Sequence, residues 1–98
     1  MSDKVIRFTS ANGFEYSFDQ DASDDLELFE YLRIANDPNE PPFNQLDAAI
    51  KGFVCIIGRE QDDRLRKFLK ERDGKIKTTV YRKEISEVMN HLGDAKKK

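Results

Sequence analysis

Residues 44–58, NQLDAAIKGFVCIIG, form the stretch that most constrains how this chain can fold. Apolar residues recur three, four, seven, eight and eleven positions after the first, and they are Leu46, Ala49, Ile50, Phe53, Val54 and Ile57. This spacing predicts a helix over 44–57 with one broad apolar face. Asn44 or a neighbour can cap its start, while Gly58 is typical of a helix end.

Three further residues, Ala48, Cys55 and Ile56, widen the apolar arc of this helix. We therefore expect it to be the core helix, buried between other elements. Gly52 in mid-helix costs about 1 kcal/mol relative to alanine, which indicates that another element packs closely against the backbone there. Cys55 is the single cysteine of the chain and is expected to be a buried, reduced thiol.

At 98 residues the chain is long enough for one domain with a single core. Its 37% charged and 38% hydrophobic residues are typical of a globular protein. No apolar run is long enough for a transmembrane helix, and residues 1–10 lack the basic and apolar regions of a signal peptide. We therefore expect a cytoplasmic protein with no membrane contact.

Residues 4–19 predict a β-hairpin whose register can be chosen from its apolar side chains. A two-residue turn at 12–13 would split these side chains between the two faces. A three-residue loop, residues 11–13, instead places the apolar side chains of both strands on one face. The pairs that this register predicts are Ser10–Phe14, Phe8–Tyr16 and Ile6–Phe18. Because an isolated hairpin is marginal in water, this face must rest on helices.

Three more helices are predicted around the core helix, over residues 23–35, 60–72 and 79–92. In the first, the apolar stripe comprises Leu28, Phe29, Tyr31, Leu32 and Ala35. The second is a charged surface helix with a narrow apolar seam, and Gly74 is expected to end it. The last is expected to end at Gly93, and its apolar stripe comprises Tyr81, Ile85, Val88, Met89 and Leu92.

The predicted fold class is therefore α+β, with an N-terminal β-hairpin packed on a bundle of about four α-helices. Residues 1–93 form the single domain, and residues 94–98 are expected to be a mobile basic tail. In the charged helix, ion pairs at i,i+4 spacing are expected between Asp62 and Arg66 and between Asp63 and Lys67.

The acidic segment 19–30, DQDASDDLELFE, places acidic or hydroxyl residues at the positions of a calcium-binding loop. However, Asp24 stands where such a loop needs glycine, and the preceding element reads as a strand rather than a helix. A helix start is favoured instead, with Ser23 or Asp24 as the cap and carboxylates where the helix dipole stabilises them. No metal site is therefore predicted.

The two halves of the chain carry opposite charge. Residues 1–50 hold eleven acids and three bases, a net charge of −8, whereas residues 51–98 hold eight acids and fourteen bases, a net charge of +6. One interpretation is that each half solvates its own surface and steers folding. The other is that acidic and basic faces select a charged partner, or let copies associate head to tail as a homo-oligomer.

The sequence offers little catalytic chemistry. His91 is the only histidine, and its place near the end of the last predicted helix favours a structural role. There is no zinc pattern, no glycine-rich phosphate loop and no nucleophile motif, so neither enzyme activity nor a cofactor is predicted. Basic residues between 64 and 83 could form a nucleic-acid stripe, but interleaved acids and the net charge of −2 disfavour it.

Four segments resemble those of the tail assembly chaperones of long-tailed phages and prophages of Gram-positive bacteria: GFEYSF, DDLELFEYL, CIIGREQDDRLRKFL and ERDGKI. In this order the resemblance spans about residues 5–92. It implies a non-catalytic protein of the bacterial cytoplasm that coats the long, helical, aggregation-prone tape measure protein. Such a chaperone is displaced as the tail tube polymerises, which makes the tail tube protein a second implied partner.

For the contact surface we predict seven residues of the charged helix and the last helix: Leu65, Arg66, Phe68, Leu69, Lys70, Tyr81 and Met89. The interpretation that these residues pack only internally stays open. A small regulatory or adaptor domain, with nucleic acid as one partner, is the alternative function. The family often makes a longer product by ribosomal frameshifting, and Lys96 to Lys98 is the peptide that an A-rich slippery site would encode. A plain solvated tail explains these lysines equally well.

Overall fold

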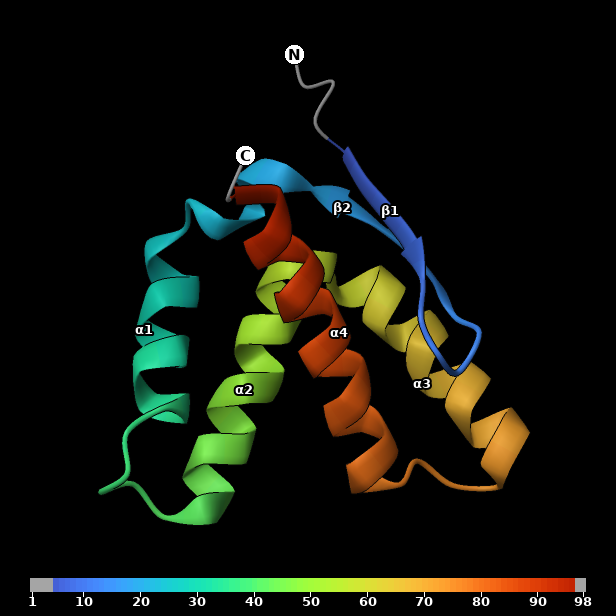
Figure 1. Cartoon of the computed structure of the whole chain (residues 1–98). Coiled ribbons are helices and arrows are strands. Elements are labelled where there is room, and N and C mark those ends of the chain that lie inside the picture. The colour runs from blue at the N-terminus through green and yellow to red at the C-terminus, as the bar shows by residue number, and fades with distance from the viewer. Residues whose placement is uncertain (1–4, 97–98) are drawn as a thin grey trace.

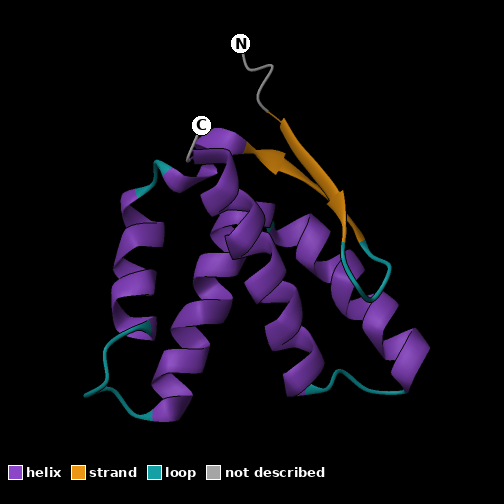
Figure 2. Cartoon of the chain, in the orientation of Figure 1, coloured by secondary structure: helices purple, strands orange, loops and turns teal. Residues whose placement is uncertain are grey.

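The computed structural model describes residues 5–96 and has an α+β fold. Its elements are the strands β1 (Val5–Thr9) and β2 (Glu15–Asp19), a short 3-10 helix η1 (Gln20–Ser23), and the helices α1 (Leu26–Ala35), α2 (Pro42–Ile57), α3 (Arg59–Asp73) and α4 (Thr78–Lys96). Figure 1 shows the hairpin along the upper side of the molecule, with the helices below it. The loops that join α1 to α2 and α3 to α4 lie at the opposite end (Figure 2).

The hairpin adopts the predicted register. Phe8 pairs with Tyr16 and Ile6 pairs with Phe18, and the Ser10 amide donates to the Phe14 carbonyl at 2.8 Å. Gly13 closes the three-residue loop with a φ of 98°, a value that glycine adopts without strain. The prediction of the three-residue loop is therefore confirmed. Its first predicted residue, at position 4, lies outside the described residues.

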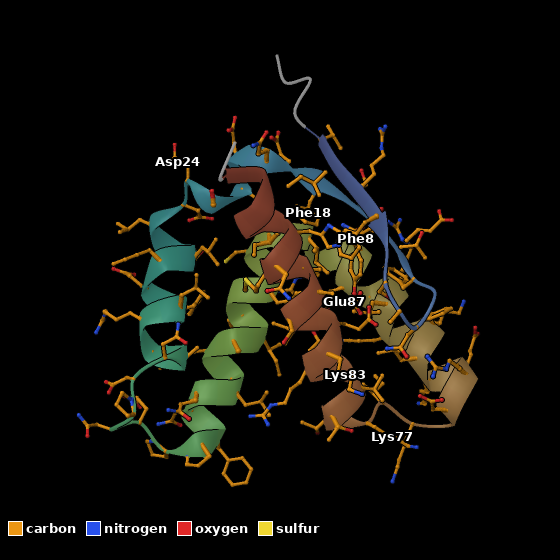
Figure 3. All side chains as sticks on the ribbon, in the orientation of Figure 1. Phe8, Phe18, Asp24, Lys77, Lys83 and Glu87 are labelled. Atoms are coloured by element: carbon orange, nitrogen blue, oxygen red, sulfur yellow. The ribbon has the colours of Figure 1, made fainter. Side chains whose placement is uncertain are left out.

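The aromatic face of the hairpin packs on α2 and α4. Phe53 of α2 is fully buried and makes edge-on contacts with Tyr16 of β2 and Tyr81 of α4, at centroid distances of 6.3 and 5.6 Å. Phe8 of β1 stacks on His91 of α4 at 3.7 Å. Figure 3 shows Phe8 and Phe18 between the strands and α4. The two-stranded sheet thus takes its support from the helices, as a marginal hairpin requires.

Helices α1 and α2 lie against each other at Gly52. A β-carbon at this position would come 3.2 Å from Leu28 Cδ1 and 3.5 Å from Tyr31 Cβ, so the predicted close approach is confirmed. The expectation that Phe29 belongs to the apolar stripe by which α1 packs is wrong, because the Phe29 side chain is 63% exposed. Leu28 points toward α2 and the next residue, about 100° further around the helix, points away.

The core helix packs between other elements, as predicted, but more of its surface is open than expected. The buried residues of α2 are Ala48, Gly52, Phe53, Ile56 and Ile57, which face α1, α4 and the hairpin. Ile50, Val54 and Cys55 are only partly buried. The Cα atoms span only 21 Å in the thinnest direction, which leaves room for about two packed layers of helices. No third layer of described residues covers the remaining side of α2.

Three helix ends differ from the prediction by two residues or more, namely the starts of α1 and α2 and the end of α4. Helix α1 begins after Asp25, whose carboxylate accepts from the amides of Glu27 and Leu28, so neither Ser23 nor Asp24 is its cap. Asp19 caps η1 in the same way, because its side chain accepts from the Asp21 amide. The carboxylates expected at a helix start thus serve as caps.

Helix α2 begins at Pro42 rather than Asn44, since proline suits the first helical position. Helix α4 continues through Gly93 to Lys96, so the predicted end at residue 92 is wrong. Gly58 and Gly74 have the positive φ values of helix ends, whereas Gly93 does not. The predicted mobile tail is therefore helical at residues 94–96, and residues 97–98 lie outside the described part.

Within residues 5–96, no helix combines the length and the apolar character needed to cross a membrane.

Candidate partner-binding groove

An open groove lies along the uncovered side of α2, between α1 and the first turns of α3. Its volume is about 660 Å³, within the range of roughly 300–1,000 Å³ that is usual for binding sites. The apolar part of the lining consists of Tyr31 from α1 and of Ile50, Val54 and Cys55 from α2. A smaller hollow of about 190 Å³ continues between α1 and α2 and shares Tyr31 and Lys51 with the groove. The uncovered side of α2 is thus concave rather than flat.

Phe43, in the first turn of α2, does not line the groove but lies on the same side of the helix as Ile50 and Val54. At 3.6 residues per turn, positions 43, 50 and 54 lie within about 40° of one another around the helix axis. They span about 16 Å along it, at 1.5 Å per residue. Phe43 is 86% exposed, the largest exposed fraction among the large apolar residues described. We call Phe43, Ile50 and Val54 the α2 stripe.

The charged residues of the groove are balanced. Three acids and three bases line it, and they are Glu27, Asp62, Asp63, Lys51, Arg59 and Arg66. Lys51 is paired with Asp47 at 3.1 Å, and Arg66 is paired with Asp62 at 2.8 Å. Glu27 of α1 and Arg59 of α3 form no ion pair within the described residues. A lining with no net charge disfavours a polyanion such as nucleic acid as the occupant.

The α3 wall of the groove is held in place by a buried polar cluster. The buried carboxylate of Asp62 accepts from Arg66 Nε at 2.8 Å and from the Tyr81 hydroxyl at 2.6 Å. The Arg66 guanidinium also lies 5.1 Å from the centroid of the Tyr81 ring. Burial and the hydrogen bond to Asp62 raise the pKa of Tyr81 well above 10. Burial acts to lower the pKa of Arg66, but its contacts with Asp62 and Tyr81 outweigh this effect and raise it. The cluster thus joins α3 to α4 behind the groove.

A second buried cluster fixes the hairpin loop to α4. Glu84 is fully buried, and its carboxylate accepts from the Tyr16 hydroxyl at 2.6 Å and from Asn12 Nδ2 at 2.7 Å. Arg72 of α3 donates to Asn12 Oδ1 at 2.7 Å, and the carboxylate of Glu87 accepts from the Ala11 amide at 3.1 Å. The loop is therefore held by side chains of α3 and α4.

The outer edge of β2 is closed by a side chain of α3. Gln61 is buried, accepts from the Ser17 amide at 2.9 Å and donates to the Ser17 carbonyl at 3.0 Å. This amide satisfies backbone groups that would otherwise pair with another strand.

The seven predicted contact residues do not form one surface. Leu65, Leu69 and Tyr81 are buried in the core, which agrees with the interpretation that they pack internally. Phe68 and Met89 are partly buried and pack against the same core. Lys70 is exposed on α3. Of the seven, only Arg66 lines the groove.

Other sequence predictions fare differently. The ion pair of Asp62 with Arg66 is confirmed, whereas Asp63 and Lys67 form no ion pair within the described residues. Cys55 is a free thiol, but it is only partly buried and lies in the groove. Burial and the charges of Asp25 and Glu27 raise its pKa. No group of three His, Cys, Asp or Glu side chains within residues 5–96 could hold a metal ion.

The residues that sequence reasoning missed are those of the α2 stripe and of the outer face of α1. The sequence places Ile50 and Val54 on the apolar face of the predicted core helix and leaves Phe43 just before its predicted start. Leu26 and Phe29 of α1, at i,i+3 spacing, are 72% and 63% exposed. An apolar arc wider than one packing face can signal such a surface, because only part of a very wide arc is covered in a small domain.

Neither a protein-family model, nor a curated protein, nor a solved structure matches this chain. Its function is therefore inferred from the groove, from the charges around it and from the sequence.

Proposed function

We propose that this protein is a non-catalytic tail assembly chaperone of a long-tailed phage or prophage of Gram-positive bacteria. In the cytoplasm of the host it binds the tape measure protein and keeps it soluble until the tail tube forms around it. The observation that carries the proposal is the α2 stripe, in which the 86% exposed Phe43 lies on the same side of α2 as Ile50 and Val54, two partly buried residues of the groove. Contiguous exposed apolar residues rimmed by charge typically mark a protein-binding surface.

The physical properties of the groove suit a chaperone. An aggregation-prone partner exposes apolar side chains, and the α2 stripe covers such side chains without burying a net charge. Charged side chains around the rim can exchange their partners at little cost, since exposed ion pairs contribute only about 0–1 kcal/mol each. Binding of many copies along one long partner would supply the affinity that a single small contact lacks.

Co-expression with the long helical product of the neighbouring downstream gene tests this function. We expect the tagged protein to co-elute with that product and to raise its soluble yield. The control is the same plasmid with an early stop codon in the gene of this protein, which keeps the gene dosage unchanged. Equal insolubility of the partner in both cultures, without co-elution, would remove the proposal. A gene order without a tail tube gene upstream and a long helical product downstream would count against it as well.

A further inference from the structure

The α2 stripe and its two walls define the shape of what can bind there. The walls are the helices α1 and α3, and the floor is α2 itself. An extended peptide would need hydrogen-bond partners for its own backbone groups, and a wall of helices offers none from its backbone. A helix satisfies its backbone internally, so it can lie on an apolar floor without that cost. The groove therefore favours a helical occupant.

The spacing of the stripe supports the same occupant. Its residues are seven and four positions apart, which places them about 10 and 6 Å apart along the axis of α2. An amphipathic helix that lies along α2 presents apolar side chains at both intervals, whereas a strand, which presents them about every 6.6 Å on one face, matches the shorter interval but not the longer one. Apolar anchors at i, i+3, i+4 and i+7 are the pattern that helix-in-groove binding uses.

The charges at one end of the groove specify the flanks of the occupant. Glu27 stands on the α1 wall and Arg59 on the α3 wall, and neither has an ion-pair partner within the described residues. A helix between them can place a basic residue beside Glu27 and an acidic residue beside Arg59. An occupant with charged residues of both signs matches a lining whose net charge is zero.

We propose that the groove binds one amphipathic α-helix of the partner, which lies along α2 with aliphatic side chains on Phe43, Ile50 and Val54 and with charged flanks of both signs. The identity of the partner rests on the proposed function, but the site and the class of its occupant rest on the geometry of the groove alone.

Titration with two synthetic 18-residue peptides tests the site. The first carries leucine at i, i+4, i+7, i+11 and i+14 with lysine and glutamate on the flanks, and the second has the same composition with leucine at every second position. We expect measurable binding of the first peptide and at least tenfold weaker binding of the second, by calorimetry or by amide chemical shifts. Equal affinity for both peptides, or no binding of the first at millimolar concentration, would overturn the proposal.

Variants of the protein locate the contact. Val54→Arg should weaken binding of the helical peptide at least tenfold, because it puts a charge on the apolar floor. Phe43→Ser should weaken binding of the peptide severalfold. Because the Phe43 side chain is 86% exposed, this substitution does not disturb the packing of the core. The matched control is Phe29→Ser, an exposed phenylalanine on the other side of α1, which should bind as the wild type does. If Phe43→Ser and Val54→Arg bind normally while Phe29→Ser does not, the site is on α1 and the proposal is wrong.

The same variants separate this inference from the proposed function. If the wild-type protein and Val54→Arg solubilise the downstream product equally well, the chaperone function is supported and the groove is not the binding site. If the wild-type protein binds the helical peptide through the α2 stripe but leaves the downstream product insoluble, the helix-binding site is supported and the chaperone function is refuted.

Discussion

Replacing Tyr16 by phenylalanine and Glu84 by methionine, singly and together, tests how the hairpin is attached to the helices. The carboxylate of Glu84 is fully buried and accepts short hydrogen bonds from the Tyr16 hydroxyl, at 2.6 Å, and from Asn12 Nδ2, at 2.7 Å. A buried carboxylate is stable only while such donors compensate for its lost hydration. Each single substitution therefore leaves one buried polar group without a partner that it has in the native protein.

The expected free-energy changes follow from these contacts. A hydrogen bond to a charged group contributes about 1.5–3 kcal/mol, so Tyr16→Phe should cost about 2 kcal/mol. Glu84→Met should cost a similar amount, since it leaves the Tyr16 hydroxyl buried at 2% exposure without its acceptor. The double variant removes both polar groups, and replacing both partners by apolar groups can be nearly neutral. We therefore expect a coupling energy of about 1–3 kcal/mol between the two positions.

Urea unfolding followed by circular dichroism measures all four proteins. With a slope of about 1.5 kcal/mol per M, each single variant should lower the midpoint by about 1.3 M, and the double variant by much less than the sum. The aromatic packing of Tyr16 against Phe8, Phe14 and Phe53 is kept in phenylalanine, so the cycle reports on the hydroxyl. Additivity to within about 0.5 kcal/mol would refute the reasoning, because independent sites add.

Three other predictions concern the two buried tyrosines and two of the glycines. Burial, together with hydrogen bonds to carboxylates, raises the pKa of Tyr16 and Tyr81 above the ordinary 10, so the unfolded chain loses these protons first. The contribution of the two tyrosines to the free energy of unfolding is complete below pH 10 and should fall above it by about 1.4 kcal/mol per pH unit for each tyrosine. Tyr81→Phe should therefore halve the loss of stability per pH unit, measured by urea unfolding at pH 10–11.5. Gly52→Val should cost about 1–3 kcal/mol and separate α1 from α2, since even a β-carbon there lies 3.2 Å from Leu28, and an unchanged melting temperature would contradict that packing. Gly93→Ala should stabilise the protein by about 0.5–1 kcal/mol because the position is helical with open space around it; a loss of stability would place the end of α4 at Gly93 after all.

The hairpin could be predicted in full because two independent constraints agree on it. The period of two in the apolar residues and the need for a positive φ at Gly13 are both visible in the sequence. Glycines are less decisive as helix ends. Gly74 ends α3 with a φ of 82°, while Gly93 sits inside α4, because glycine tolerates both conformations and only the packing beyond the helix decides between them.

The attachment of the hairpin could not be predicted, because its partners are far apart in the chain. Glu84 follows Arg82 and Lys83 and looks like any solvated acid of a surface helix. Its burial depends on Tyr16 and Asn12, which are 68 and 72 residues away. No periodicity links such positions, so buried polar pairs of this kind appear only in three dimensions.

The groove was hidden for a related reason. Periodicity identified the apolar residues of α2, of which Phe53 and Ile57 are buried and Ile50 and Val54 are not, because it does not show how many neighbours are available to cover them. Helix α1 covers Gly52, and α4 and the hairpin cover Phe53, whereas Ile50 is only partly covered by the core and Val54 lines the groove. Leu65 and Leu69, two of the predicted contact residues, are buried in the core, because the apolar seam of α3 faces inward.

The most direct test of the groove as the partner-binding site uses Cys55, the one cysteine of the chain, which lies in its lining. The rate of alkylation of this thiol by iodoacetamide, measured by mass spectrometry of the Cys55 peptide, reports whether the groove is open or filled. We expect severalfold slower alkylation in the complex purified with the tape measure protein than in the free protein at the same pH. The same rate in the free protein and in a stable, co-eluting complex would contradict binding in the groove.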